Sequence, residues 1–150
     1  MPPTTASSAR AHTSGPAAAR PFREGLLALD PPRLLGSRCA ACGTTTFPPR
    51  DFCPACRAAE GLQRIELAAN GRVHSYTVVR QAPPGVEVPY VLAWVDLPSD
   101  QVRLMSTVVG IAPEEVVLDL PVELEVAPFG TADDGAELMG YRFRAAEVAA

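Results

Sequence analysis

The sequence contains no lysine, no long apolar run and only two histidines, and these absences limit what the protein can be. All 13 basic residues are arginines, a usage that reflects GC-rich coding and carries no functional inference. No apolar run approaches the roughly 18–20 residues of a membrane-spanning helix, so we expect a soluble protein that does not enter a membrane. A length of 150 residues excludes a large multidomain enzyme, because a domain typically holds about 100–200 residues.

A secretory signal is also missing from the start of the sequence. The first twenty residues lack an apolar core of roughly 7–15 residues. They hold two arginines and no acidic residue, as a transit peptide does, but Pro2, Pro3, Gly15 and Pro16 would interrupt its amphipathic helix. We therefore interpret residues 1–20 as a disordered tail and expect a cytoplasmic protein in a reducing compartment.

The formal net charge of −4 is unevenly distributed along the chain. Residues 1–64 hold 8 arginines and 4 acidic residues, a balance of +4. Residues 65–150 hold 5 arginines and 13 acidic residues, a balance of −8. The two halves therefore favour different partners. The acidic second half would repel phosphate, which argues against nucleic acid as a partner.

All four cysteines lie in two C-x2-C pairs, Cys39 with Cys42 and Cys53 with Cys56, separated by ten residues. Two such turns facing each other supply four thiolates in the tetrahedral geometry of structural Zn²⁺ sites. Two disulfides, a redox pair or a catalytic thiol are the alternatives, and iron competes with zinc for four thiolates. A reducing compartment disfavours disulfides. We predict one structural Zn²⁺ on all four cysteines, in a closed site without catalytic chemistry.

The residues before the cysteines predict a helix, and those after them predict strands. Apolar residues within 21–35 recur at a helical spacing that stops at Asp30. From Ile65 onward, short alternating segments are bounded by glycine, proline or aspartate. Between the third and fourth of these segments, residues 112–116 predict a short helix with Pro113 in its first turn. Strands are expected at residues 72–81, 90–97, 101–109, 122–126 and 141–144.

Five strands with a small helix between the third and fourth are typical of a five-stranded Greek-key barrel of the OB type. The predicted fold is therefore mainly β. A tail at residues 1–20 precedes a helix and rubredoxin-like zinc ribbon at 21–64 and an OB-fold barrel at 65–150.

OB barrels often bind oligonucleotides, so a zinc-ribbon and OB-fold nucleic-acid-binding module is the alternative function. Phe47, Tyr76 and Trp94 are able to stack on bases. In a chain with nine aromatic residues, however, core or interface roles are favoured for them.

Five motifs follow one another along the chain: FREGL at 22–26, RCAACG and FPPRDFCPAC within 38–56, GRVHSYTVVRQAPPG at 71–85, PYVLAWVDL at 89–97 and YRFR at 141–144. With them, over about residues 21–145, the chain resembles the acyl-CoA-associated zinc-ribbon and OB-fold proteins that accompany thiolase-like enzymes. The FPPR, SYTVVR and PYVLA segments are much more specific than the cysteine spacing.

The resemblance implies an accessory subunit of a hetero-oligomer. Such a subunit helps to bind an acyl-CoA or acyl thioester. The partner, which is a thiolase, a lipid-transfer-type thiolase or aldolase, or an acyltransferase, supplies the nucleophilic cysteine.

Three arginines are candidate contacts for CoA, because guanidinium pairs with phosphate in a bidentate way. Arg50 is the favoured residue, with Arg38 and Arg80 next, and a solvated surface role is the alternative for each.

Phe47, Pro48 and Pro49 form a rigid apolar finger. Three roles are open to this finger: it docks in a groove of the partner, it covers the pantetheine arm of CoA, or it only braces the ribbon. Tyr76 is a further candidate for contact with the partner or ligand.

No catalytic residue is predicted. The cysteines are assigned to metal, a Ser–His pairing motif is missing, and the histidines are His12 in the tail and His74 in a predicted strand. His74 as a general base is the alternative, although a single strand histidine is more often a surface or packed residue. We therefore expect a subunit that is not itself an enzyme.

Overall fold

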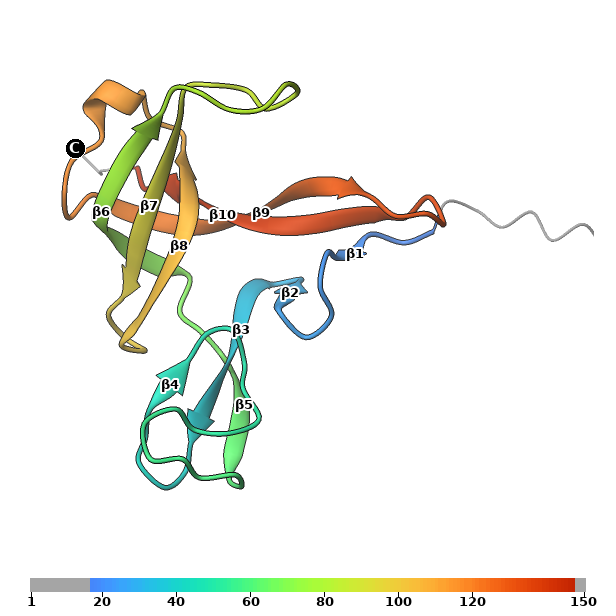
Figure 1. Ribbon diagram of the computed structural model, residues 1–150, viewed down its shortest axis with the longest axis vertical. Helices are drawn as coiled ribbons and strands as arrows, with labels where there is room; N and C mark the ends of the chain where they lie inside the picture. The colour runs from blue at the N-terminus through green and yellow to red at the C-terminus, as the bar shows by residue number, and fades with distance from the viewer. Residues whose placement is uncertain (1–16, 148–150) are drawn as a thin grey trace, which may run out of the picture.

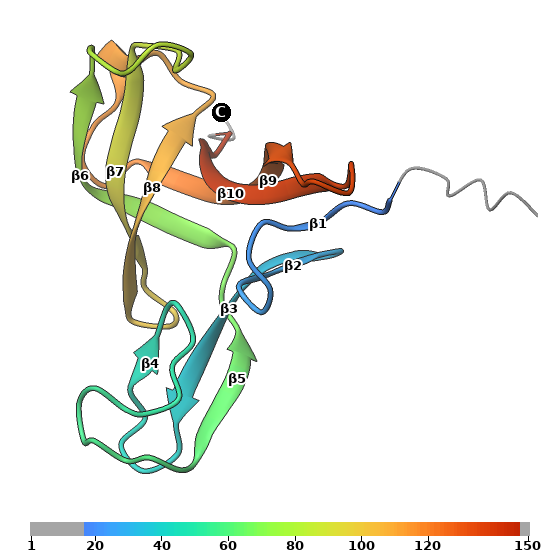
Figure 2. The same cartoon turned by 45° about the vertical axis from the view of Figure 1, so that its right-hand side comes forward.

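The computed structural model describes residues 17–147, and regular structure in this range is β-strand apart from one 3-10 turn (Figures 1 and 2). The predicted tail lies outside the described residues as far as residue 16, and Arg20 already belongs to a strand. No helix in the described part of the chain is long and apolar enough to cross a membrane. In chain order the elements are β1 (Arg20–Pro21), β2 (Leu27–Leu29), β3 (Pro32–Cys39), β4 (Thr45–Thr46), β5 (Leu62–Glu66), β6 (Asn70–Val79), β7 (Tyr90–Leu97), β8 (Val102–Val109), η1 (Pro113–Glu115), β9 (Pro121–Thr131) and β10 (Glu137–Ala145).

Strands β6 to β10 close into a five-stranded barrel. They are neighbours in the order β10, β8, β7, β6, β9, and β9 pairs back onto β10, which closes the sheet. The pairing of β8 with β10 is parallel, and the other barrel pairings are antiparallel. This arrangement is that of an OB-type Greek-key barrel, as predicted. The short helix expected at residues 112–116 is reduced to the single turn η1.

Alternation of side chains along the strands fills the barrel interior. In β7, Val91, Ala93, Val95 and Leu97 are buried while the residues between them face outward. Successive side chains of a strand point to opposite faces of a sheet, so a period of two places this whole set inside. Phe143 of β10 is fully buried among them.

The prediction of a helix at residues 21–35 is wrong. The segment forms β1, β2 and the start of β3 instead, and Leu27 of β2 pairs with Leu34 of β3 in a tight antiparallel hairpin. Gly25, with a φ of 75°, turns the chain ahead of β2. A short apolar run fits the periods of a helix and of a strand equally well. Burial of Leu27 and Leu34 in the core of the whole molecule decides between them.

The ribbon, made of β3, β4, β5 and their connecting turns, shares one hydrophobic core with the barrel. Leu34 of β3 and Leu67 beyond β5 are buried in the same cluster as Val73 of the barrel. Across the joint, Phe47 packs edge-on against Tyr141 of β10, with ring centroids 5.7 Å apart. These contacts hold the ribbon against one end of the barrel (Figure 2).

Leu34 provides a test of the shared core. Its side chain is fully buried, and Leu-to-Ala changes in cores cost about 2–5 kcal/mol. We expect Leu34→Ala to lower the free energy of unfolding in urea by about this amount in one transition. Leu118→Ala is the control at an exposed leucine and should change stability by less than about 0.5 kcal/mol. A barrel that unfolds at the same urea concentration with and without Leu34→Ala would contradict a common core.

Candidate metal centre and binding surfaces

The four predicted zinc ligands converge at the end of the ribbon. Cys39 is the last residue of β3, Cys42 follows in the next turn, and Cys53 and Cys56 lie between β4 and β5. Their sulfur atoms all lie within 4.8 Å of one another. The Sγ atoms of Cys39 and Cys56 are 3.6 Å apart, and those of Cys42 and Cys53 are 3.5 Å apart.

This geometry fits a tetrahedral four-thiolate zinc site. Zn–S distances of about 2.3 Å in a regular tetrahedron imply sulfur–sulfur edges of about 3.8 Å. A disulfide requires about 2.05 Å between the sulfurs, and all four thiols are free. The four cysteines would hold the ion, and four protein ligands leave no coordination position open for substrate.

The two cysteine turns have the same backbone form. The N–H of Gly43 donates to the carbonyl of Cys39, and the N–H of Arg57 donates to the carbonyl of Cys53. Both donors have positive φ, 76° at Gly43 and 65° at Arg57. In the first turn, contact with the Thr44 hydroxyl lowers the pKa of the Cys42 thiol to about 6. A thiolate is the form that binds metal, so all four thiols lose their protons when the ion binds.

The three arginines proposed for CoA are not brought together. The Arg38 guanidinium contacts the Thr45 hydroxyl at 3.1 Å and pairs with Asp100 at 3.5 Å. Arg80 pairs with Glu114 of η1 at 3.6 Å, at the end of the barrel far from the ribbon (Figure 1).

Arg50 is exposed on the ribbon, and its backbone N–H donates to the buried Ser37 hydroxyl at 2.9 Å. Its guanidinium forms no ion pair or hydrogen bond with other residues in the range 17–147.

The apolar finger of Phe47, Pro48 and Pro49 lies against the protein itself. All three residues are half-buried, and Phe47 is part of the layer that packs on the core. The Ser37 hydroxyl bonds to Thr46 just ahead of the finger, at 2.8 Å. These contacts favour the bracing role over a free docking finger.

An exposed apolar surface crosses the outside of the barrel. Trp94 of β7 and Met105 of β8 are 42% and 45% exposed on it. Trp94 lies opposite Met105 in the sheet register, so the two side chains share one face. Tyr76 of β6, which is 39% exposed, lies opposite the buried Ala93 and therefore faces the other side of the sheet. We call Trp94 and Met105 the outer face. The sequence reasoning named Tyr76 and Trp94 but missed Met105, although alternation with buried Leu104 places it outside.

His74 lies beside the outer face in a polar cluster. Arg103 forms hydrogen bonds to both carboxylate oxygens of Asp96, at 2.6 and 3.1 Å, and these bonds lower the pKa of Asp96. The Nδ1 atom of His74 lies 3.1 Å from Arg103 Nη2 and 3.3 Å from Asp96 Oδ2. The ion pair of Arg103 and Asp96 therefore holds the His74 ring. Among the hydrogen bonds within residues 17–147, none joins this ring to a serine or a cysteine.

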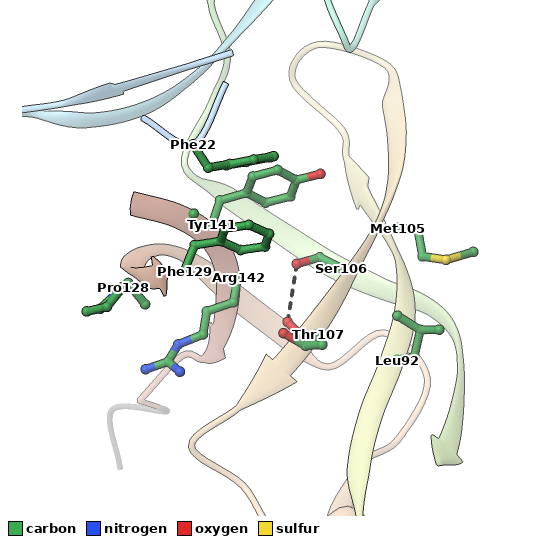
Figure 3. A pocket seen from close by; sticks show the side chains of 11 residues that line it. Phe22, Leu92, Met105, Ser106, Thr107, Pro128, Phe129, Tyr141 and Arg142 are labelled. Atoms are coloured by element: carbon green, nitrogen blue, oxygen red, sulfur yellow. Dashed lines mark hydrogen bonds between the residues drawn. The ribbon is translucent and has the colours of Figure 1, made fainter. Parts of the chain in front are cut away.

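A groove of about 520 Å³ opens beside the outer face, between β8 and β10 (Figure 3). Phe22 and Phe129 stack on one side of it with ring centroids 4.7 Å apart. Phe129 is the extra residue of a β-bulge, because Leu138 pairs with Gly130 and Met139 with Pro128. The sequence reasoning missed this groove, since only the strand pairing brings residues 22, 106, 129 and 141 together.

A four-cysteine ribbon packed on an OB-type barrel defines the class of zinc-ribbon and OB-fold proteins. Residues 28–61 match the rubredoxin-like zinc ribbon domain of ChsH2, and residues 64–127 match its C-terminal OB-fold domain. The chain is 37% identical over 117 residues to a DUF35 domain-containing scaffold protein of Methanocaldococcus jannaschii, covering 76% of this chain and 82% of that protein. The chain therefore belongs to the DUF35 family.

Two further relatives carry enzyme-complex names. The chain is 33% identical over 113 residues to the benzoylsuccinyl-CoA thiolase subunit BbsA of Thauera aromatica, covering 75% of this chain and 76% of that protein. The structure is similar to that of an Ltp2-ChsH2(DUF35) aldolase, with a TM-score of 0.62 and 37% identity over 75% of this chain and 84% of that chain. The resemblance to thiolase-associated proteins, read from the motifs, is confirmed.

The metal site generates a direct prediction. We expect the purified chain to contain about one zinc ion, measured by atomic emission, and Cys39→Ser or Cys56→Ser to remove it and give insoluble protein. Ala41→Ser, which introduces the same side chain at an exposed position of the first turn and keeps all four thiols, is the control and should retain the metal. Well-folded protein without bound metal, or Cys39→Ser protein with full zinc content, would contradict the assignment.

Proposed function

We propose that this chain is a non-catalytic scaffolding subunit of a thiolase-like enzyme complex, in which it contributes to the binding of acyl-CoA. The observation that carries the proposal is the outer face, an apolar surface that no other residue of the chain covers in the described range. Strands two and three of an OB barrel form its usual binding face, and here these are β7 and β8. The names of the relatives, a scaffold protein and a thiolase subunit, support a protein partner for that surface.

The chemistry of the chain supports an accessory role. Its four thiols point at one another in the metal site, so none is left as a nucleophile. His74 is engaged with Arg103 and Asp96. The catalytic groups would therefore come from the partner, which we take to be a thiolase, a lipid-transfer-type thiolase or aldolase, or a related acyltransferase.

Acyl-CoA binding is the finer part of the proposal. Arg38 and Arg80 already pair with carboxylates in different parts of the molecule, which supports Arg50 as the phosphate contact. One exposed arginine is a weak anion site by itself, so the complex, rather than the isolated chain, would bind acyl-CoA.

Nucleic-acid binding stays the alternative, since Trp94 is exposed on the face that OB barrels use. The charge balance of −8 over residues 65–150 argues against it. The alternative predicts salt-dependent binding to single-stranded DNA or RNA, and an absence of binding at low salt would remove it.

Complex formation is the main test. We expect the chain to co-elute in size-exclusion chromatography with a thiolase-type subunit after the two are co-expressed. Trp94→Ser should raise the dissociation constant at least about tenfold, because it removes a large apolar side chain from the contact. Leu118→Ser, at an exposed leucine near η1, is the control. Failure to co-elute with any thiolase-like partner would contradict the proposal.

Ligand binding is tested separately by calorimetry with acyl-CoA. We expect binding by the complex and none by the isolated chain, with Arg50→Glu weakening it at least about tenfold through loss of a charged hydrogen bond. Arg72→Glu carries the same charge change on the barrel and serves as control. The isolated chain should release no CoA from acyl-CoA, and turnover abolished by His74→Ala would overturn the non-catalytic assignment.

A further inference from the structure

Strand β8 has one edge without a partner over most of its length. On the other edge it pairs with β7 from Val102 to Val108. On the open edge, β10 pairs with β8 only at Val108 and Val109. Residues 102–107 therefore have no neighbouring strand on this side in the part of the chain that the structure describes.

Strand β10 is open on the facing side. β9 occupies one edge of β10 along its whole length. On the other edge β1 pairs with Leu138 and Met139, and β8 pairs with Phe143 and Arg144. Residues 140–142 between them have no strand partner within residues 17–147. The two strands thus diverge from the pair formed by Val108 and Phe143, and the groove of about 520 Å³ lies between them (Figure 3).

The open edge of β8 lacks the features that usually protect one. Backbone N–H and C=O groups of alternate residues face each side of a strand, so about half of those in 102–107 face the open side. Met105, Ser106 and Thr107 of this edge line the groove. Exposed edges are commonly protected by lysine, proline or a bulge. The segment VRLMST has none of these, and its one charged residue, Arg103, is neutralised by Asp96.

We propose that the groove takes an extended segment of the partner enzyme, which pairs with β8 as an added strand. This inference rests on the proposed function. Strand addition supplies hydrogen-bond partners to the free backbone groups, and alternate side chains of the added strand enter the groove. Six residues of strand span about 20 Å, which sets the length of the segment.

The walls of the groove indicate the side chains of that segment. Phe22, Phe129, Tyr141 and Met105 present apolar surface to it. Arg142 also lines it, but its guanidinium bonds to Glu125, which also pairs with Arg144 at 2.8 Å. Glu125 offsets only one of these two arginines, so a single positive charge remains beside the groove. The apolar walls, rather than charge, favour a strand with apolar residues at alternate positions.

The shape of the surroundings favours a single segment over a second copy of this chain. The hairpin of β9 and β10 projects past the open edge of β8 and stands beside it (Figures 1 and 2). Phe129 on this hairpin is 66% exposed. A whole barrel approaching edge to edge would meet the hairpin before it reached β8, whereas a tail or extended loop reaches the edge.

Amide hydrogen exchange with residue resolution tests the proposal on the full chain, free and in complex with the co-expressed enzyme subunit. We expect amides at alternate positions of 102–107 to exchange at least about tenfold more slowly in the complex, because the added strand accepts their hydrogen bonds. Amides of β8 that already bond to β7 should not change. A complex that forms without this alternating protection would overturn the inference and leave the proposed function intact. Failure of any complex to form would contradict both.

A pair of variants gives a second readout. Phe129→Ser removes an exposed wall of the groove and should raise the dissociation constant of the complex at least about tenfold. Leu118→Ser is the matched control, since both side chains are exposed in the free chain. Unchanged zinc content and urea unfolding would verify that both variants fold. Equal dissociation constants for the two variants would contradict binding in the groove.

The same exchange measurement on the free chain tests two other occupants of the groove. Protection of residues 102–107 that disappears when residues 1–16 are deleted would assign the groove to the N-terminal segment of the chain itself. Protection that rises with protein concentration would assign it to a second copy. Either result would overturn the proposal.

Discussion

The ribbon buries few side chains of its own, and its position depends on close packing along β3. This strand carries Leu34, which lies in the core shared with the barrel, and ends at Cys39 in the metal site. Between them a Cβ atom on Gly36 would lie 2.7 Å from the carbonyl oxygen of Thr46 and 2.9 Å from the Leu67 side chain. Only glycine allows β4 and Leu67 to approach β3 this closely. One strand thus joins the metal site to the barrel.

The metal site and the binding surfaces have different tasks in this arrangement. A module as small as the ribbon has too little core to be stable alone, and four thiolates on one ion compensate for that. The closed site stabilises the ribbon, and the ribbon in turn holds Phe47 against Tyr141, close to the groove. In the proposed complex, the zinc site acts on partner binding through the position of the ribbon.

The parallel pair of β8 and β10 shapes the surface on which the proposals depend. Because this pair extends over two residue positions only, the barrel is held closed at one end and the strands separate toward the other. The outer face and the groove share Met105, so they form one continuous apolar region on β8. A partner that covers the outer face would also lie over the open edge.

Local patterns in the sequence determined a large part of this protein. The C-x2-C spacing was sufficient to select the four metal ligands, and alternation was sufficient to locate the barrel strands, with residues 90–97 predicted as β7 is observed. Both signals are local, since a turn or a strand depends on residues adjacent in the chain. Burial of Leu104 likewise implied exposure of Met105, so that outer-face residue was within reach of the same reasoning.

Only the tertiary structure decided the rest. Residues 21–35 form strands because Leu27 and Leu34 meet the common core, a contact that short apolar periodicity does not encode. Arg80 is separated from Arg50 because β6 runs from the ribbon to the opposite end of the barrel. The groove arises where segments distant in sequence, around residues 22, 106, 129 and 141, come together. Such features depend on strand pairing and packing across the whole chain, so they became visible only in the folded molecule.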